Sequence, residues 1–238
     1  MNHLSNLPLL TTEQMVEVDR LMIEDWGIGL AQMMENAGRS MAELTRRSLG
    51  GSVAGQQVLV LSGGGNNGGG GMVAARHLHN WGAQVQVTLV GDKKRLKDVP
   101  AQQYSIIQRM GLVTSSPDFE AAEVIIDAMI GYGLTGDPRP PVADWISLAN
   151  ASGKRILALD TPSGLNTTTG VPSPSCIRAA ATLTLAMPKV GLVTHEAQPF
   201  VGDLYLADIS VPPELYAAPS LGLGVVSPFS TESIIKLS

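Results

Sequence analysis

The sequence predicts an α/β protein in which a mostly parallel sheet lies between two layers of helices. Two observations lead to this prediction. Short apolar runs of strand length recur along the chain, and segments with helical periodicity separate them. Hydrophobic residues make up 44% of the 238 residues, which is enough for one large core. We therefore expect a single domain with a Rossmann-like, three-layer α/β/α sandwich.

Two helices are expected before the first strand, and they give residues 1–50 the character of an N-terminal cap or helical arm. Thr11 and Thr12 open the first helix, because a threonine side chain can accept a hydrogen bond from a free amide of the first turn. Gly27 and Gly29 end it. The second helix is expected over residues 30–48, where a stripe of methionines indicates core packing or a subunit contact.

Residues 51–215 are expected to form the Rossmann-like core. The predicted strands and helices alternate along the chain. The strands are 57–61, 85–90, 123–127, 155–160, 180–187 and 203–206, and the helices are 72–81, 101–110 and 144–150. Residues 216–238 are predicted to be a C-terminal tail on the surface, with no regular element from Ser220 onward.

Charge and cysteine content argue against several classes of protein. The formal net charge is −5, which disfavours a nucleic-acid-binding surface and a polybasic membrane anchor. The longest apolar stretch is far shorter than the ~20 residues that a membrane span needs. A single cysteine, Cys176, cannot form an intrachain disulfide, so a reducing, cytoplasmic location is expected.

Polar or glycine-rich segments follow three of the predicted strands. They cover residues 62–71, 127–137 and 160–164. In a doubly wound sheet, ligands bind beyond the carboxyl ends of the strands. These three segments should therefore meet at one edge and form a ligand site.

The glycine run at residues 63–71 leads into a helix and is expected to cradle phosphate groups. Backbone amides without side chains can approach an anion closely, and the helix N-terminus adds partial positive charge. The run lacks the Lys-Ser or Lys-Thr of a Walker loop. It also lacks an acidic residue about 20 positions on, at the end of the second strand, since Asp92 falls in a predicted loop. A flexible surface loop is the alternative interpretation.

Five side chains could carry chemistry at the same edge. Asp127 and Asp160 each end an apolar strand and are either turn formers or functional carboxylates. Asn67, Asp127 and Ser163 offer only oxygen or amide ligands, which suit a hard cation rather than zinc. Their single formal charge favours a monovalent ion. Lys189 is either a solvated lysine or a residue that reaches this edge.

Several motifs together resemble the YjeF N-terminal domain family, from about residue 9 to residue 215. The residues that carry the resemblance are Met34-Glu35-Asn36-Ala37-Gly38, Gly65-Asn66-Asn67-Gly68-Gly69, residues 73–78, Asp127-Ala128, Asp160-Thr161-Pro162-Ser163-Gly164 and residues 188–192. That family includes the NAD(P)H-hydrate epimerases. The resemblance implies an isomerase of metabolite repair, which interconverts the R and S epimers of hydrated NADH or NADPH. A partner dehydratase on a separate chain would then restore the cofactor.

The resemblance also assigns site residues and partners. It implies that the nucleotide substrate contacts Asn66, Asn67, Gly68, Gly69, Gly70, Gly131, Tyr132, Gly133, Leu134, Thr135, Gly136 and Asp137. Asp160 would bind the substrate beside the reacting ring. Asn67, Asp127 and Ser163 would hold a potassium ion. Family members are commonly dimeric, often through the N-terminal helices, so a homodimer is expected.

The chemistry of the implied substrate points to Asp160 as the catalytic residue. The hydrated carbon lies next to the ring nitrogen, so protonation of its hydroxyl expels water and leaves an iminium ion. Water can then return on the other face, and one carboxyl can act first as acid and then as base. Where the family loop usually carries an Asp, this chain has Gly70. The alternative hypothesis is therefore a non-catalytic member that binds a nucleotide or a protein partner.

Overall fold

The computed structural model describes residues 4, 7–96 and 98–238, and a seven-stranded sheet forms its centre. The strand order is β2-β1-β3-β4-β5-β6-β7. The strands are β1 (Gln57–Ser62), β2 (Gln84–Leu89), β3 (Val124–Ala128), β4 (Arg155–Leu159), β5 (Ala181–Leu185), β6 (Asp203–Ala207) and β7 (Ile234–Lys236). The first six are parallel, and β7 runs antiparallel to β6. The predicted mostly parallel sheet is confirmed.

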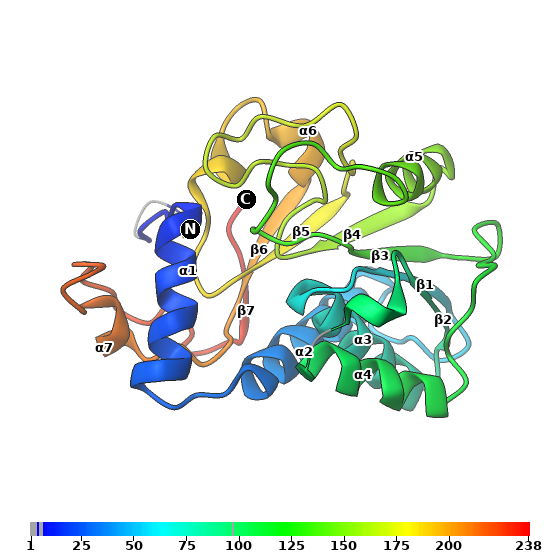
Figure 1. Ribbon diagram of the computed structural model, residues 1–238, viewed down its shortest axis with the longest axis horizontal. Coiled ribbons are helices and arrows are strands. Elements are labelled where there is room, and N and C mark those ends of the chain that lie inside the picture. Colours follow the sequence, from blue (N-terminus) through cyan, green and yellow to red (C-terminus); the bar gives the residue numbers. More distant parts are fainter. Residues whose placement is uncertain (1–3, 5–6, 97) are drawn as a thin grey trace.

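Helices cover both faces of this sheet (Figure 1). One layer holds α2 (Leu30–Ser48), α3 (Asn66–Asn80) and α4 (Asp98–Arg109), and the other holds α5 (Val142–Ala151) and the short α6 (Gln198–Val201). Val58 and Val60 of β1 pack in the cluster that contains α3, whereas Leu59 and Leu61 pack with α5. This alternation follows from the two-residue period of a strand. The predicted three-layer sandwich is therefore confirmed.

The N-terminal helices are packed onto the domain. Helix α1 (Thr12–Arg20) continues into a π-helical turn, η2 (Leu21–Asp25). As predicted, Thr11 caps α1: its side chain accepts a hydrogen bond from the amide of Gln14, and the Gln14 side chain accepts one from the amide of Thr11. The α2 methionines Met33, Met34 and Met41 are at most 4% exposed, so their role in the core is confirmed.

The segment before α1 is joined to the loop after β5. The amide of Leu10 donates to the carbonyl of Pro188 at 2.9 Å, and the amide of Val190 donates to the carbonyl of Leu10 at 3.0 Å. The side chain of Thr12 also lies within hydrogen-bond distance of Thr167 and Thr168. These contacts hold α1 beside the carboxyl ends of the central strands.

The glycine run is mostly helical, so the prediction that its helix begins at residue 72 is wrong. Helix α3 begins at Asn66, and a Cβ at Gly71 would lie only 2.5 Å from the Cβ of Ala128. A Cβ at Gly38 of α2 would lie equally close to Val73 of α3. The glycines allow α3 to pack tightly between the sheet and α2, and their low helix propensity concealed the helix in the sequence.

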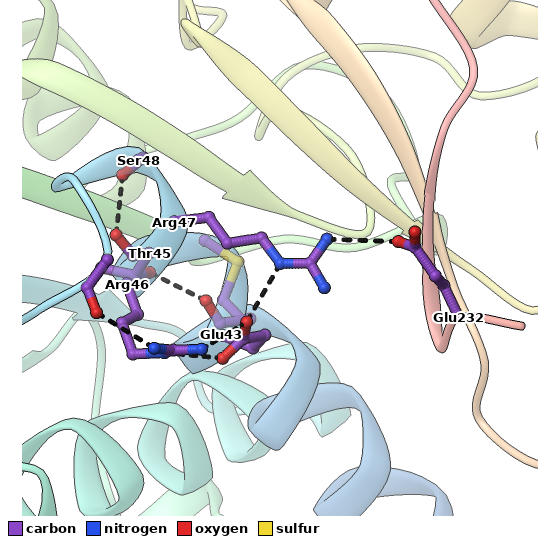
Figure 2. A network of polar contacts seen from close by, with 8 residues as sticks. Glu43, Thr45, Arg46, Arg47, Ser48 and Glu232 are labelled. Atoms are coloured by element: carbon purple, nitrogen blue, oxygen red, sulfur yellow. Dashed lines mark hydrogen bonds and ion pairs between the residues drawn. The ribbon is translucent and has the colours of Figure 1, made fainter.

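The C-terminal segment also departs from the prediction. Residues 234–236 form the edge strand β7, so the prediction of no regular element beyond Ser220 is wrong. A segment of three residues is too short to show the alternation of apolar and polar residues that predicts a strand. It becomes a strand because it pairs with the edge of β6. Figure 2 shows an ion pair that joins the segment before β7 to α2. The guanidinium of Arg47, which also pairs with Glu43, lies 3.7 Å from the carboxylate of Glu232. The short helix α7 (Pro213–Tyr216) packs with the core cluster that includes α1.

Candidate functional site

A cavity of about 360 Å³ lies where the loops after β1, β3 and β4 meet. Helices α1 and α2 also line it, through residues such as Met15 and Met33. The predicted convergence of the three loops is thus confirmed. The site residues predicted from the sequence that line the cavity are Asn66, Asn67, Gly70, Gly131, Tyr132, Gly133 and Asp160.

The N-terminus of α3 opens into this cavity. Gly65 is the N-cap residue, and no side chain caps the helix there. A Cβ at Gly65 would meet no atom within 4 Å, so the surface over the first amides is open. The first amides of a helix have no acceptor within it, and they carry partial positive charge. This end of α3 therefore has the properties of an anion site.

Other residues of the predicted nucleotide site lie outside the cavity lining. Gly68 packs against the backbone of Gly63, and a Cβ at Gly69 would lie 2.6 Å from the sulfur of Met34. Leu134, Thr135, Gly136 and Asp137 follow Gly133 in the loop after β3 and do not line the cavity either. That these residues contact the nucleotide remains a prediction.

Gly70 lies in the wall of the cavity. A Cβ at this position would approach Cδ2 of Leu159 to 2.9 Å. Any side chain here would require Leu159 to shift. The glycine therefore leaves this part of the wall free of a side chain.

Asp160 and Lys189 form a buried ion pair at the end of β4. The side chain of Asp160 is 5% exposed and that of Lys189 is fully buried, with 2.6 Å between Nζ and Oδ1. The lysine Nζ also donates to Oγ1 of Thr184 at 3.0 Å and to the carbonyl of Leu185 at 2.9 Å. Three acceptors satisfy its three hydrogens. Of the two possibilities for Lys189, the structure supports the one in which it reaches the sheet edge.

The backbone around Asp160 is shaped to direct its carboxylate. Asp160 has a φ of +66°, a left-handed conformation that is uncommon outside glycine. Its Oδ2 accepts a hydrogen bond from the amide of Tyr132 at 3.0 Å. Such conformations are often found at functional sites, where the surrounding structure holds them in place.

Asp19 of α1 is a cavity residue that the sequence analysis missed. It accepts a hydrogen bond from the hydroxyl of Tyr132. Burial raises the pKa of the Asp19 carboxyl, and the charge of Asp160 adds to this, while Tyr132 and Lys189 act in the opposite direction. Burial and the two nearby carboxylates likewise raise the pKa of the Tyr132 phenol. The only sequence signal was that Asp19 lies four positions after Met15, on the same face of α1.

Asp127 and Ser163 join the loops after β3 and β4. Oδ1 of Asp127 accepts the Ser163 hydroxyl at 2.7 Å and Oδ2 accepts the Ser163 amide at 2.8 Å. Ser163 Oγ in turn accepts the amide of Ile130 at 2.8 Å. Burial raises the pKa of the Asp127 carboxyl to about 6, against the lowering effect of these hydrogen bonds. The turn-forming role considered for Asp127 is present in the structure.

The three predicted cation ligands come from the three converging segments: Asn67 from the first turn of α3, Asp127 from the end of β3 and Ser163 from the loop after β4. Asn67 donates from Nδ2 to the carbonyl of Leu159 at 3.1 Å, which places its amide at the end of β4. A Cβ at Gly131 would lie 3.2 Å from the Cβ of Asn67, so Asn67 also borders the loop that contacts Ser163. The carboxylate, hydroxyl and amide oxygens of Asp127, Ser163 and Asn67 match the ligand chemistry of a hard cation.

Residues 30–191 match the family described as YjeF-related protein N-terminus. The chain belongs to this family. The NAD(P)H-hydrate epimerase of Dehalogenimonas lykanthroporepellens is 41% identical over 96% of this chain and 92% of its own length. The bifunctional NAD(P)H-hydrate repair enzyme Nnr of Moorella thermoacetica is 35% identical over 88% of this chain, but the match covers only 42% of the bifunctional protein.

The fold of this YjeF_N chain agrees with a solved relative. The crystal structure of yeast ynu0, YNL200c, matches with a TM-score of 0.82 and 26% identity, over 97% of this chain and 100% of the yeast chain. Across the residues that the structure describes, no helix is both long and apolar enough to cross a membrane.

Proposed function

We propose that this protein is an NAD(P)H-hydrate epimerase, which interconverts the R and S epimers of hydrated NADH and NADPH. The observation that carries this proposal is the buried ion pair of Asp160 and Lys189 at the wall of the cavity. The uncapped N-terminus of α3 lines the same cavity. The Dehalogenimonas lykanthroporepellens protein, which matches along nearly its whole length, is named as an NAD(P)H-hydrate epimerase. The non-catalytic alternative is not favoured, because the Asp160 site is intact despite Gly70.

The arrangement of the strands sets how the substrate lies. The phosphates bind at the N-terminus of α3, after β1, and the hydrated ring binds at Asp160, after β4. Strand β3 lies between β1 and β4, so the phosphates and the ring would contact different loops of the one cavity. The two ends lie close together, because Nδ2 of Asn67 in α3 donates to the carbonyl of Leu159, next to Asp160, at 3.1 Å.

Asp160 exchanges protons with the substrate. Protonation of the hemiaminal hydroxyl lets it leave as water, and the ring nitrogen stabilises the resulting cation as an iminium ion. Water then adds to the opposite face and loses a proton. Lys189 compensates the charge of the Asp160 carboxylate, and the amide of Tyr132 fixes its orientation. The apolar wall formed by Met15, Met33 and Leu30 limits the access of bulk water.

A potassium ion held by Asn67, Asp127 and Ser163 belongs to the same proposal. Bound there, it would offset the charge of Asp127. The three residues would fix the loops that carry the ring-binding and phosphate-binding groups.

We also propose a homodimer, a cytoplasmic location and a separate dehydratase that consumes the S epimer.

The activity is tested by mixing the purified protein with the R epimer of hydrated NADH or hydrated NADPH. Formation of the S epimer is followed by chromatography that resolves the two epimers. We expect a rate well above the spontaneous one. No acceleration with either nucleotide would refute the proposed function.

The role of Asp160 is tested with Asp160→Asn, which keeps an acceptor for Lys189 but no longer exchanges a proton. We expect kcat to fall by about 10²–10⁴, the usual contribution of general acid–base catalysis. Melting temperature and NADH affinity serve as controls for folding and binding. Unchanged turnover in a folded, NADH-binding variant would show that Asp160 is not the proton-exchanging group.

A further inference from the structure

We propose that Asp19 is a second catalytic acid–base residue, which acts on the face of the hydrated ring opposite Asp160. This inference rests on the proposed epimerase function. It adds a carboxyl group from helix α1, which lies outside the sheet-edge loops where the sequence placed the site.

Helix α1 is fixed where it can supply this group. The backbone pairing of Leu10 with Pro188 and Val190 joins the start of α1 to the segment that carries Lys189. From there α1 runs along the cavity, with Met15 and Asp19 in its lining. Asp19 therefore faces the cavity from the helical side, while Asp160 faces it from the sheet.

Tyr132 relates the two carboxyl groups. Its hydroxyl donates to Oδ2 of Asp19, and its backbone amide donates to Oδ2 of Asp160. The two carboxyls are thus at opposite ends of one tyrosine residue. Enzymes that act on both faces of a sugar ring through a cationic intermediate likewise place two carboxyls apart, with room for water between them.

The two carboxyls have different surroundings. Asp160 is paired with the ammonium group of Lys189, whereas no ion pair to Asp19 is present among the residues the structure describes. The charged and titratable groups near Asp19 are Tyr132, Tyr216, Asp160 and Lys189, and burial is the largest of the influences that raise its pKa. Carboxyls whose environments differ in this way commonly divide into an acid and a base.

The resulting steps balance in protons. Protonated Asp19 gives its proton to the ring hydroxyl, the carbon–oxygen bond breaks, and water leaves the iminium ion. A second water forms a carbon–oxygen bond on the other face and gives a proton to the Asp160 carboxylate. The reverse reaction starts from this state with the roles exchanged. Proton exchange with solvent resets the pair for another turnover in the same direction.

The experiment compares Asp19→Asn with Tyr132→Phe and with Glu13→Gln, an exposed acidic residue on the same helix. Asp19→Asn keeps an oxygen acceptor for the Tyr132 hydroxyl, so it separates proton transfer from support of the tyrosine. We expect kcat to fall by about 10²-fold or more in Asp19→Asn. KM, NADH affinity and melting temperature should stay near wild type, and Glu13→Gln should behave as wild type.

The pH profile gives a second readout. Wild-type kcat should decline as the pH rises through the pKa of Asp19, and Asp19→Asn should lose this decline. Because the Tyr132 hydrogen bond lowers the pKa of Asp19, Tyr132→Phe should move the decline to higher pH. Asp19→Asn with wild-type kcat and an unchanged profile would overturn the inference. Inactive wild-type protein would instead refute the epimerase function itself.

Discussion

Lys189 has no exposed side-chain surface, so its positive charge depends on protein atoms that replace water. Asp160 supplies the opposite charge, and Thr184 and Leu185 supply the remaining acceptors. Removal of one member of a buried ion pair leaves the other charge buried without a partner. This lowers the free energy of unfolding much more than removal of both members does. The pair should therefore matter to folding as well as to chemistry.

We predict that Lys189→Met lowers the free energy of unfolding by about 3–5 kcal/mol, because the Asp160 carboxylate loses its partner inside the protein. The double variant with Asp160→Asn should recover most of this loss, although it should remain inactive. Urea denaturation of the two variants and wild type measures the difference. Equal losses in the single and double variants would show that the charge of Asp160 is not the source.

At the residue scale, the sequence was informative about Asp160 and Asp127 because both directly follow apolar strands, and the ends of parallel strands share one edge. It left Lys189 open, since a lysine after a proline gives no sign of burial. For Asp19 it held only one signal, the spacing of four positions from Met15, which does not point to a site. The role of that residue depends on the contact with Tyr132, 113 positions away in the chain, and no local pattern encodes such a contact.

Helices α2 and α3 pack closely against each other at Gly38. A Cβ at Gly38 would lie 2.5 Å from the Cβ of Val73 and 2.6 Å from the carbonyl oxygen of Gly70. Neither atom is the flexible end of a side chain, so the backbones of the two helices would have to separate. Because Gly70 lies in the cavity wall, such a separation would also disturb the site.

We predict that Gly38→Ala destabilises the protein by about 1–3 kcal/mol, the usual cost of overpacking, despite the higher helix propensity of alanine. Arg39→Ala on the exposed side of the same helix is the matched control and should have little effect. Thermal or urea unfolding measures both. A stability gain in Gly38→Ala would mean that the helices can separate at no cost.

At the element scale, the alternation of strands and helices was predictable, because apolar runs and helical periods are local properties. The start of α3 was not. Glycine is an unfavourable helix residue, and here it is present because neighbouring backbones leave no space for a Cβ. That reason exists only in the folded protein. Strand β7 was missed for a related reason, since its partner strand determines it.

On the surface of the molecule, apolar side chains are exposed along the first helical segment, α1–η2. Val16, Ile23 and Trp26 are 54%, 44% and 46% exposed, and the first two are seven positions apart, on one side of the α1–η2 helix. This exposed apolar surface is the structural support for the proposed homodimer, which would bury it between two copies of the chain.

We predict that Val16→Glu combined with Ile23→Glu converts the proposed dimer to a monomer, because charged side chains would lose their water in the interface. Leu148→Glu is the control, since Leu148 is 51% exposed on α5. Size-exclusion chromatography with light scattering distinguishes the two states. Wild-type protein that stays monomeric at high concentration would refute the dimer, and a dimer that persists in the double variant would place its interface elsewhere.

The pairing of Leu10 with the segment around Lys189 also affects how the protein is made. During synthesis, α1 leaves the ribosome well before the loop after β5, which pairs with the segment that precedes α1. Until that loop has been made, the apolar face of α1 stays uncovered and the contacts that fix Asp19 at the cavity are incomplete. A shortened chain that lacks residues 188–190 could still fold its glycine-rich helix, but it would have no assembled cavity. Enzymatic activity is therefore a test of complete synthesis and folding as well as of chemistry.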